Sequence, residues 1–584
     1  MAASYLAAPP SADRLDRAEA GSVTKQLTPE QYNNSIQEFA KRFPSKTLYP
    51  GLHFGKLTAF LQKPTIPETK RSLLSNYSPV FNFATLYTFS ENGSVNVQKL
   101  NDTRELQQHT TAEEARMLFL CGQPCPQWLL EVGATYHIDP EFFQRHLDFL
   151  SAMGSRDYFV QPSLLSTSRY IIQLEYMSIG ELPSQAREMS QGELDSLRAS
   201  NKSDMLEYLA TIDKNMTTKP PTFESIVRSC YLLDKSHFAI EQRISICFNQ
   251  TSSSGWTVVV WIDTGKPLAP EQKGPWAEFL RANKVNGLET FLPWIPYHPN
   301  LALQSQSVSI SHARRGPKDF EQSASLIHLD YGKTLDKHLM AQDPFYAIHE
   351  LFVLCAFSKT QFLTALESKI AADAETVIDL GQNLSPSNMM YFQNLLDAQV
   401  DKLQENIKSI RSQEDMGWFR DTAAPQDAKC AAARVSLLKY YEGLLSHAKS
   451  LSKRCKARLN ILMNRAAVVE SNKAIEQAKA VTKLTRLAFF FTPLGFTSSF
   501  FGMNLGPFSA SPSFGLWLFF AVSTPLVAIL LILMTLDVSY LFGTIGVLQK
   551  QKKSKIGRVG SWFGFGRDLN SIDLSTISGQ HLSS

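Results

Sequence analysis

The seven cysteines of this 584-residue chain form no recognisable pattern. They are scattered, and only Cys121 and Cys125 lie close together, with no second pair nearby. This spacing excludes a disulfide framework and a structural zinc site built from two cysteine pairs. The interpretation is therefore that the thiols are reduced and mostly buried.

Charge is scarce as well, since 19% of the residues are Asp, Glu, Lys or Arg and the formal net charge is +4. So small a net charge argues against a nucleic-acid partner and against an acid-rich disordered chain. There is no glycine-rich phosphate loop, and the twelve histidines are scattered. We therefore expect no enzyme activity.

What the sequence does have is two long apolar runs near its C-terminal end. Residues 484–504 contain one charge, Arg486, and residues 514–536 contain none. A helix of about 20 residues is about 30 Å long, the thickness of the hydrocarbon core of a bilayer. We therefore predict two transmembrane helices, residues 484–504 and 514–540, joined by an external loop over residues 505–513.

The charges that flank these runs predict the topology. Basic residues lie before the first run and after the second, and the loop between the runs has no charge. By the positive-inside rule, both flanks, and with them both termini, are predicted to be cytosolic. The N-terminal residues fit neither a cleaved signal peptide nor an arginine-rich transit peptide, which favours the plasma membrane. The basic residues are Lys473, Lys479, Lys483 and Arg486 on one side and Lys550, Lys552, Lys553, Lys555 and Arg558 on the other.

The turn after the first run begins Gly502-Met503-Asn504. At the outer end of the first of two closing spans, this tripeptide resembles the signature of the CorA family of divalent-cation channels. The resemblance extends back through Leu484-Thr485, Pro493-Leu494, Phe496 and Phe501, and it looks most like the fungal CorA-like branch. It implies a homo-oligomer, a pentamer, in a lipid bilayer, with Mg²⁺ as the transported ion and possible regulator and with no covalently bound cofactor.

Magnesium gives up its water reluctantly, so a selectivity ring should offer neutral oxygens to the hydrated ion. Asn504, repeated around an oligomer, would supply such a ring and would be the metal-contacting residue. Gly502 would let helices approach closely at the mouth, and Met503 would pack behind it. The alternative is an asparagine that only caps the end of a span.

Small or hydroxylated residues recur at helical intervals before Asn504, down to Leu484. They predict a weakly polar pore lining that narrows to an apolar constriction at Leu484, of a kind that can gate by dewetting. The alternative is that these residues only permit tight helix contact. The predicted lining consists of Leu484, Ala488, Thr492, Gly495 and Ser499.

Two features leave the mechanism open. Lys550, Lys552, Lys553 and Lys555 would ring the inner mouth, as the resemblance implies, or would anchor the chain to anionic lipid. The loop 505–513 has no acidic residue, whereas bacterial CorA proteins usually carry one there. The uncharged loop keeps a non-conducting scaffold tethered to the membrane as one rival. Zinc or other transition-metal transport on the same fold is the other, because the resemblance also extends to a zinc-transporting branch of the family with the same architecture.

The rest of the chain is predicted to be an α/β cytosolic domain followed by a long helical stalk. Residues 243–248 and 256–263 read as a strand hairpin, and residues 170–176 as another strand. A helix over residues 138–150 is predicted, capped by Asp139. The predicted order is a disordered lead (1–35), the α/β domain (36–340), a helical hairpin (341–420), the stalk helix (421–483), the two spans with their loop, and a basic cytosolic tail (541–584).

The stalk carries an apolar seam. Tyr441, Ala448, Cys455, Leu462 and Val469 are seven residues apart, as in a packed helix of a coiled coil. A helix of this length entering a membrane needs a partner, and we expect copies of the same chain to supply it.

Overall fold

The structure, a computed structural model, divides into two compact units, residues 1–463 and 464–584. It describes residues 27–43, 45–62, 83–90, 92–107, 114–148, 170–218, 223–250, 255–268, 274–285, 290–296, 298, 322–379, 386–412, 425–503 and 517–532.

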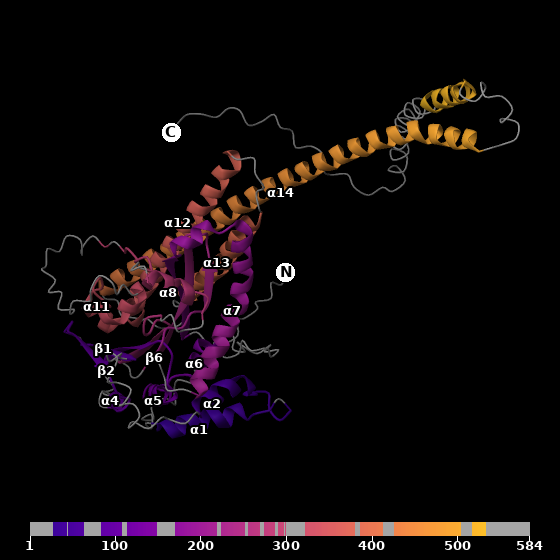
Figure 1. Cartoon of the computed structure of the whole chain (residues 1–584). Helices are drawn as coiled ribbons and strands as arrows, with labels where there is room; N and C mark the ends of the chain where they lie inside the picture. The colour runs from indigo at the N-terminus through magenta and orange to yellow at the C-terminus, as the bar shows by residue number, and fades with distance from the viewer. Residues whose placement is uncertain are drawn as a thin grey trace, which may run out of the picture. The chain divides into compact units, whose positions relative to one another are not determined.

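A mixed seven-stranded sheet forms the centre of the first unit (Figure 1). The strand order is β2-β1-β3-β7-β6-β4, and β5 also pairs with β6. β3 and β7 are parallel and the other pairs are antiparallel. The strands are β1 (Ala84–Phe89), β2 (Val95–Leu100), β3 (Ala115–Cys121), β4 (Ile171–Glu181), β5 (Ser229–Leu232), β6 (His237–Gln250) and β7 (Trp256–Ile262).

Helices cover both faces of this sheet, because its central strands are apolar on both sides. Every residue of β7 is buried. Val258 packs in one hydrophobic cluster with residues of the late helices α12, α13 and α14, whereas Val259 packs in the other with residues of the early helices. The early helices are α1 (Pro29–Ala40), α2 (Gly55–Leu61), α4 (Arg104–Gln107), α5 (Pro126–Tyr136), α6 (Pro140–His146) and α7 (Gln191–Thr218). The later ones are α8 (Ala277–Val285), α10 (Ile327–Asp330), α11 (Lys337–Gln342), α12 (Pro344–Asp379), α13 (Ser387–Ser412) and α14 (Pro425–Gly502).

The α/β organisation and the long helix agree with the sequence analysis. β6 and β7 form the predicted hairpin, and β4 covers the third predicted strand. Asp139 caps α6 by accepting a hydrogen bond from the Glu141 amide. The predicted helix over 138–150 is shorter, since α6 ends at His146.

Two predicted boundaries fall inside helices. α1 starts at Pro29, before the expected end of the lead at residue 35, and a capping box of Thr28 and Gln31 fixes that start. The boundary between the stalk helix and the first span, residues 483/484, falls within α14, whose described part begins at Pro425, where proline suits the first helical position. Residue 421, where the stalk was predicted to begin, lies outside the described residues.

The apolar seam of α14 is buried within its own chain from Tyr441 to Leu462. Tyr441, Ala448 and Cys455 are each 0% exposed. The Tyr441 hydroxyl donates to the Phe352 carbonyl of α12 at 3.0 Å, and the Cys455 thiol donates to the Met389 carbonyl of α13 at 3.2 Å. The expectation that copies of the chain cover this part of the seam is therefore wrong, because α12 and α13 already fill it.

Beyond the seam, α14 continues as a single helix to Gly502. Val469, the last residue of the predicted seam, is 52% exposed. Within the described ranges, no helix combines the length and the apolar character needed to span a membrane.

Candidate functional site

The C-terminal end of α14 packs against a second helix, residues 517–532, within the second unit. Ser523 Oγ donates to Thr497 Oγ1 at 3.0 Å, and both side chains are 3% exposed. About one helical turn further along α14, the rings of Phe501 and Phe519 meet edge to face with centroids 6.3 Å apart. The residue number rises from Thr497 to Phe501 on α14, whereas it falls from Ser523 to Phe519 on the second helix. The two helices are therefore antiparallel.

Pro493 lies inside α14 without ending it. Proline has no amide hydrogen, so the carbonyl one turn earlier loses its helical donor. The Thr497 hydroxyl lies within 3.0 Å of both the Pro493 and Leu494 carbonyls, and it donates inside the helix while accepting from Ser523. This hydroxyl joins the region around the proline to the second helix.

All five residues predicted to line a pore are exposed and share one face of α14. At about 100° per residue, this face lies about 180° around the helix from the stripe of Pro493, Thr497 and Phe501 that faces the second helix. The second helix therefore leaves the predicted face open. The five residues are Leu484, Ala488, Thr492, Gly495 and Ser499.

The open face is weakly polar. The Thr492 hydroxyl donates to the Ala488 carbonyl at 2.7 Å, and the Thr485 hydroxyl donates to the Val481 carbonyl at 2.8 Å. Each hydroxyl hydrogen is thus used within the helix, and the oxygen keeps lone pairs that can accept a hydrogen bond from water. Such a face suits contact with the outer water of a hydrated cation and not direct coordination.

Two glycines of this segment face open space in the part of the chain that the structure describes. A Cβ atom added at Gly495 or at Gly502 would meet nothing within 4 Å. Packing inside one chain therefore does not require glycine at either position. Small residues on an open helix face are typical of places where a second helix approaches closely.

The remaining predicted residues lie at or beyond the end of α14. Gly502 is its last residue, and Met503 follows it with 60% of its surface exposed. Asn504 and the tail residues Lys550, Lys552, Lys553 and Lys555 lie outside the described residues, so their predicted roles remain predictions.

Large apolar side chains are exposed on the other faces of the two described helices of the second unit. They are exposed on both helices, and an exposed apolar surface of this extent marks a site of contact with a protein or a membrane. Those on α14 are Phe489, Phe490, Phe491, Phe496 and Phe500, and those on the second helix include Trp517, Phe520, Ile529, Leu531 and Ile532.

A buried polar network in the first unit is the strongest competing site. His146 Nδ1 lies 2.8 Å from Ser245 Oγ, and its Nε2 lies 3.1 Å from Asp263 Oδ1, an order found in hydrolytic triads. All three residues are 0% exposed, and Trp261 stacks on the His146 ring with centroids 3.9 Å apart. No substrate can reach this serine, so the network is structural.

Arg228 completes the network from the segment before β5. Its guanidinium donates two hydrogen bonds to Asp263, at 2.7 and 2.8 Å, and one to Asp148 at 2.7 Å. Asp148 also accepts a hydrogen bond from Arg243 at 2.7 Å. The network thus fastens the end of α6 to β6 and β7. Sequence analysis missed it because its members are separated by loops and strands and share no local motif.

We expect this network to make stability depend on pH. Burial lowers the pKa of His146 to about 4, although Asp263 opposes that shift. In the unfolded chain a histidine titrates near pH 6.5, so the unfolded state gains a proton first and stability falls between about pH 6.5 and pH 4. The urea concentration at the midpoint of unfolding of the first unit should be lower at pH 5 than at pH 7. Limited proteolysis of the full chain measures this midpoint.

The matched variant is His146→Gln, which should be less stable at pH 7 but should lose less between pH 7 and pH 5. Part of the dependence should remain, because burial also lowers the pKa of His328 to about 4. An equal loss in both proteins would contradict the role given to His146.

In the parts of the chain that the structure describes, no group of three or more His, Cys, Asp or Glu side chains is placed to hold a metal ion. Residues 433–535 match the family model described as CorA-like Mg²⁺ transporter protein. This range covers most of α14, the second helix and the residues between them. No curated protein matches the chain.

Proposed function

This chain is a member of the CorA family over residues 433–535, and on that premise we propose that it conducts divalent cations, Mg²⁺ foremost, as a homo-oligomeric membrane channel. The family is one of transporters and not of enzymes. The match does not separate the fungal branch from the others.

The open face of α14 is the observation that carries the proposal. It holds small and hydroxylated residues opposite the stripe that the second helix covers, and a Cβ atom added at either of its two glycines would meet nothing within 4 Å. Around an oligomer axis, such faces would surround a water path, and the apolar side chains on the other faces would meet lipid or neighbouring copies. The copies would be joined along this segment and not along the seam of Tyr441, which α12 and α13 fill.

The remaining site residues complete the proposed channel. Residues 484–504 and 514–540 would be its two spans in the plasma membrane, with both termini cytosolic. Asn504, with Gly502 and Met503, would form the outer ring of a pentamer, and Leu484 the inner constriction. Lys550, Lys552, Lys553 and Lys555 would surround the inner mouth, and Mg²⁺ would also regulate the channel. A membrane potential of 100 mV would drive a divalent ion inward with about 4.6 kcal/mol.

Uptake by a magnesium-starved host tests the proposal directly. Wild type should restore Mg²⁺ uptake, and Asn504→Ala should reduce it by about tenfold, because the ring of amide oxygens that faces the hydrated ion is lost. Asn472→Ala is the matched control, since Asn472 is an exposed asparagine earlier on α14. Absence of uptake by wild type, or equal uptake by Asn504→Ala and the control at equal expression, would refute the proposal.

Two rivals make different predictions in the same assay. If the protein is a zinc or transition-metal transporter, zinc, cobalt or nickel should inhibit uptake at low concentration. The concentration of Mg²⁺ needed for the same inhibition should be much higher. A non-conducting scaffold, which the uncharged loop 505–513 favours, would reach the membrane as an oligomer without restoring uptake.

A further inference from the structure

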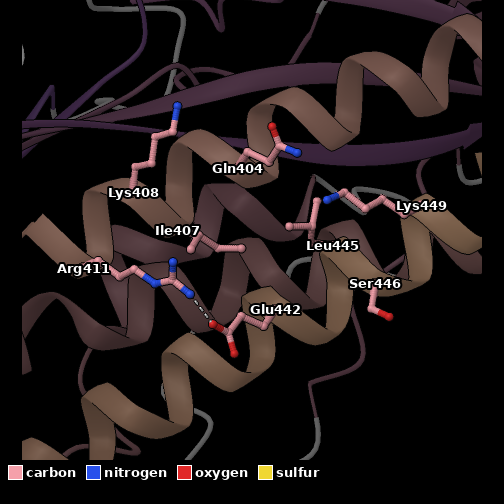
Figure 2. A pocket seen from close by; sticks show the side chains of 8 residues that line it. All are labelled: Gln404, Ile407, Lys408, Arg411, Glu442, Leu445, Ser446 and Lys449. Carbon is pink, nitrogen blue, oxygen red and sulfur yellow. Dashed lines mark hydrogen bonds and ion pairs between the residues drawn. The ribbon is translucent and has the colours of Figure 1, made fainter.

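A groove with a positive rim runs between α13 and α14 in the first unit. Its volume is about 460 Å³. Figure 2 shows its lining side chains along the two helices, with the ion pair of Arg411 and Glu442 at one end. The lining residues are Gln404, Ile407, Lys408 and Arg411 from α13 and Glu442, Leu445, Ser446 and Lys449 from α14.

Cations outnumber acids around this groove. Arg411 Nη2 lies 2.6 Å from Glu442 Oε1, and both side chains are largely exposed. Lys408 and Lys449 are exposed and form no ion pair with any residue in the described ranges. The groove therefore keeps two unneutralised positive charges, within a stretch of α14, residues 428–469, that has nine Lys or Arg and one Glu.

The floor of the groove is apolar. Ile407 is 5% exposed, and Leu445 is partly buried against the same hydrophobic cluster. A ligand that matches the groove therefore has an anionic part for the rim and a flat or apolar part for the floor. The volume lies within the range of small-molecule sites, about 300–1,000 Å³. The lining spans about two helical turns, which is short for a docked peptide helix.

We propose that this groove binds a soluble nucleoside polyphosphate, with its phosphates at Lys408, Arg411 and Lys449 and its base and ribose on Ile407 and Leu445. Lysine and arginine bind phosphate oxygens through charge-assisted hydrogen bonds. A ligand held by both helices ties α13 to α14, the helix that continues to Gly502. The proposal is independent of ion conduction, because every lining residue lies in the first unit.

Titration calorimetry on the detergent-solubilised full chain tests the groove, with ATP and inorganic tripolyphosphate as probes in the absence of divalent cations. We expect ATP to bind more tightly than tripolyphosphate, because only ATP covers the apolar floor. Lys408→Gln combined with Lys449→Gln should weaken ATP binding by about tenfold or more. Lys439→Gln is the control, since Lys439 is an exposed lysine of α14 that does not line the groove.

Glu442→Gln gives a prediction of opposite sign. It removes the one acid of the groove and releases Arg411, so ATP binding should tighten about threefold to tenfold. A gain in affinity cannot arise from damage to the fold. The proposal is overturned by the absence of saturable ATP binding, or by groove variants that bind like the Lys439→Gln control. Equal affinity for the two probes would overturn the role of the apolar floor.

Discussion

Replacing Arg228 by methionine should lower the free energy of unfolding of the first unit by about 3–5 kcal/mol. The guanidinium bridges Asp263, which is 0% exposed, and Asp148. Burial alone would raise the pKa of Asp263, but Arg228 and His146 outweigh that effect and hold it well below its usual range. Without Arg228, the Asp263 carboxylate stays buried beside a neutral histidine and must either remain charged at high cost or take up a proton.

The effect should be measured as the urea midpoint of the first unit by limited proteolysis of the full chain at pH 7. Arg104→Met is the matched control, because its ion pair with Asp102 is exposed on the arginine side and should contribute less than about 1 kcal/mol. A combined Arg228→Met and Asp263→Leu variant should regain part of the loss, since it leaves no buried carboxylate at that position. If Arg228→Met were no less stable than the control, the network would have no structural role.

The same network shows where sequence reasoning fails. Arg228 and Asp263 are 35 residues apart, and His146 and Ser245 are 99 residues apart. Nothing local to any of them signals a partner, because the contact exists only after β6 and β7 have paired and α6 has packed on them. The features that were predicted correctly are local. Asp139 before a proline predicts a helix start, and the β-branched run at Trp256 predicts a strand.

The seam of α14 lies between these two cases. A seven-residue apolar spacing shows that one face of a helix is buried, and Tyr441, Ala448 and Cys455 are buried. It cannot show whether the covering surface comes from the same chain or from a copy, because both present similar apolar side chains. Met389 and Phe352 of the same chain reach that face, so the periodicity was right, and from Tyr441 to Cys455 the covering surface comes from the chain itself and not from a copy.

The candidate ion path was predicted from the sizes of residues at helical spacing, and the structure adds which face the second helix covers. Nothing in the sequence distinguishes Thr497 from the neighbouring serine and threonine residues as the side chain that contacts Ser523. That contact separates two faces of α14 of comparable polarity, and so it permits a test that distinguishes them.

Ser499→Cys should react with a positively charged, membrane-impermeant thiol reagent applied from outside, and the reaction should reduce divalent uptake to roughly one tenth or less. The added cation would occupy the water path and repel the arriving ions. Thr497→Cys is the matched control, because the Thr497 side chain is buried against Ser523 and should not react. Background labelling should be low, since all seven native cysteines are buried and none lies beyond Cys455.

A stricter test compares cysteines placed at different depths along the open face of α14. If the path narrows at Leu484, cysteines at positions 499 and 492 should react from outside, and Leu484→Cys should react much more slowly. The reaction at positions 499 and 492 should also slow in the presence of Mg²⁺, because a hydrated ion then shares the path with the reagent. Blockage through Thr497→Cys but not through Ser499→Cys would place the water path on the opposite face of α14. Equal reaction at all four positions would mean that neither face is enclosed, and that the second unit surrounds no pore.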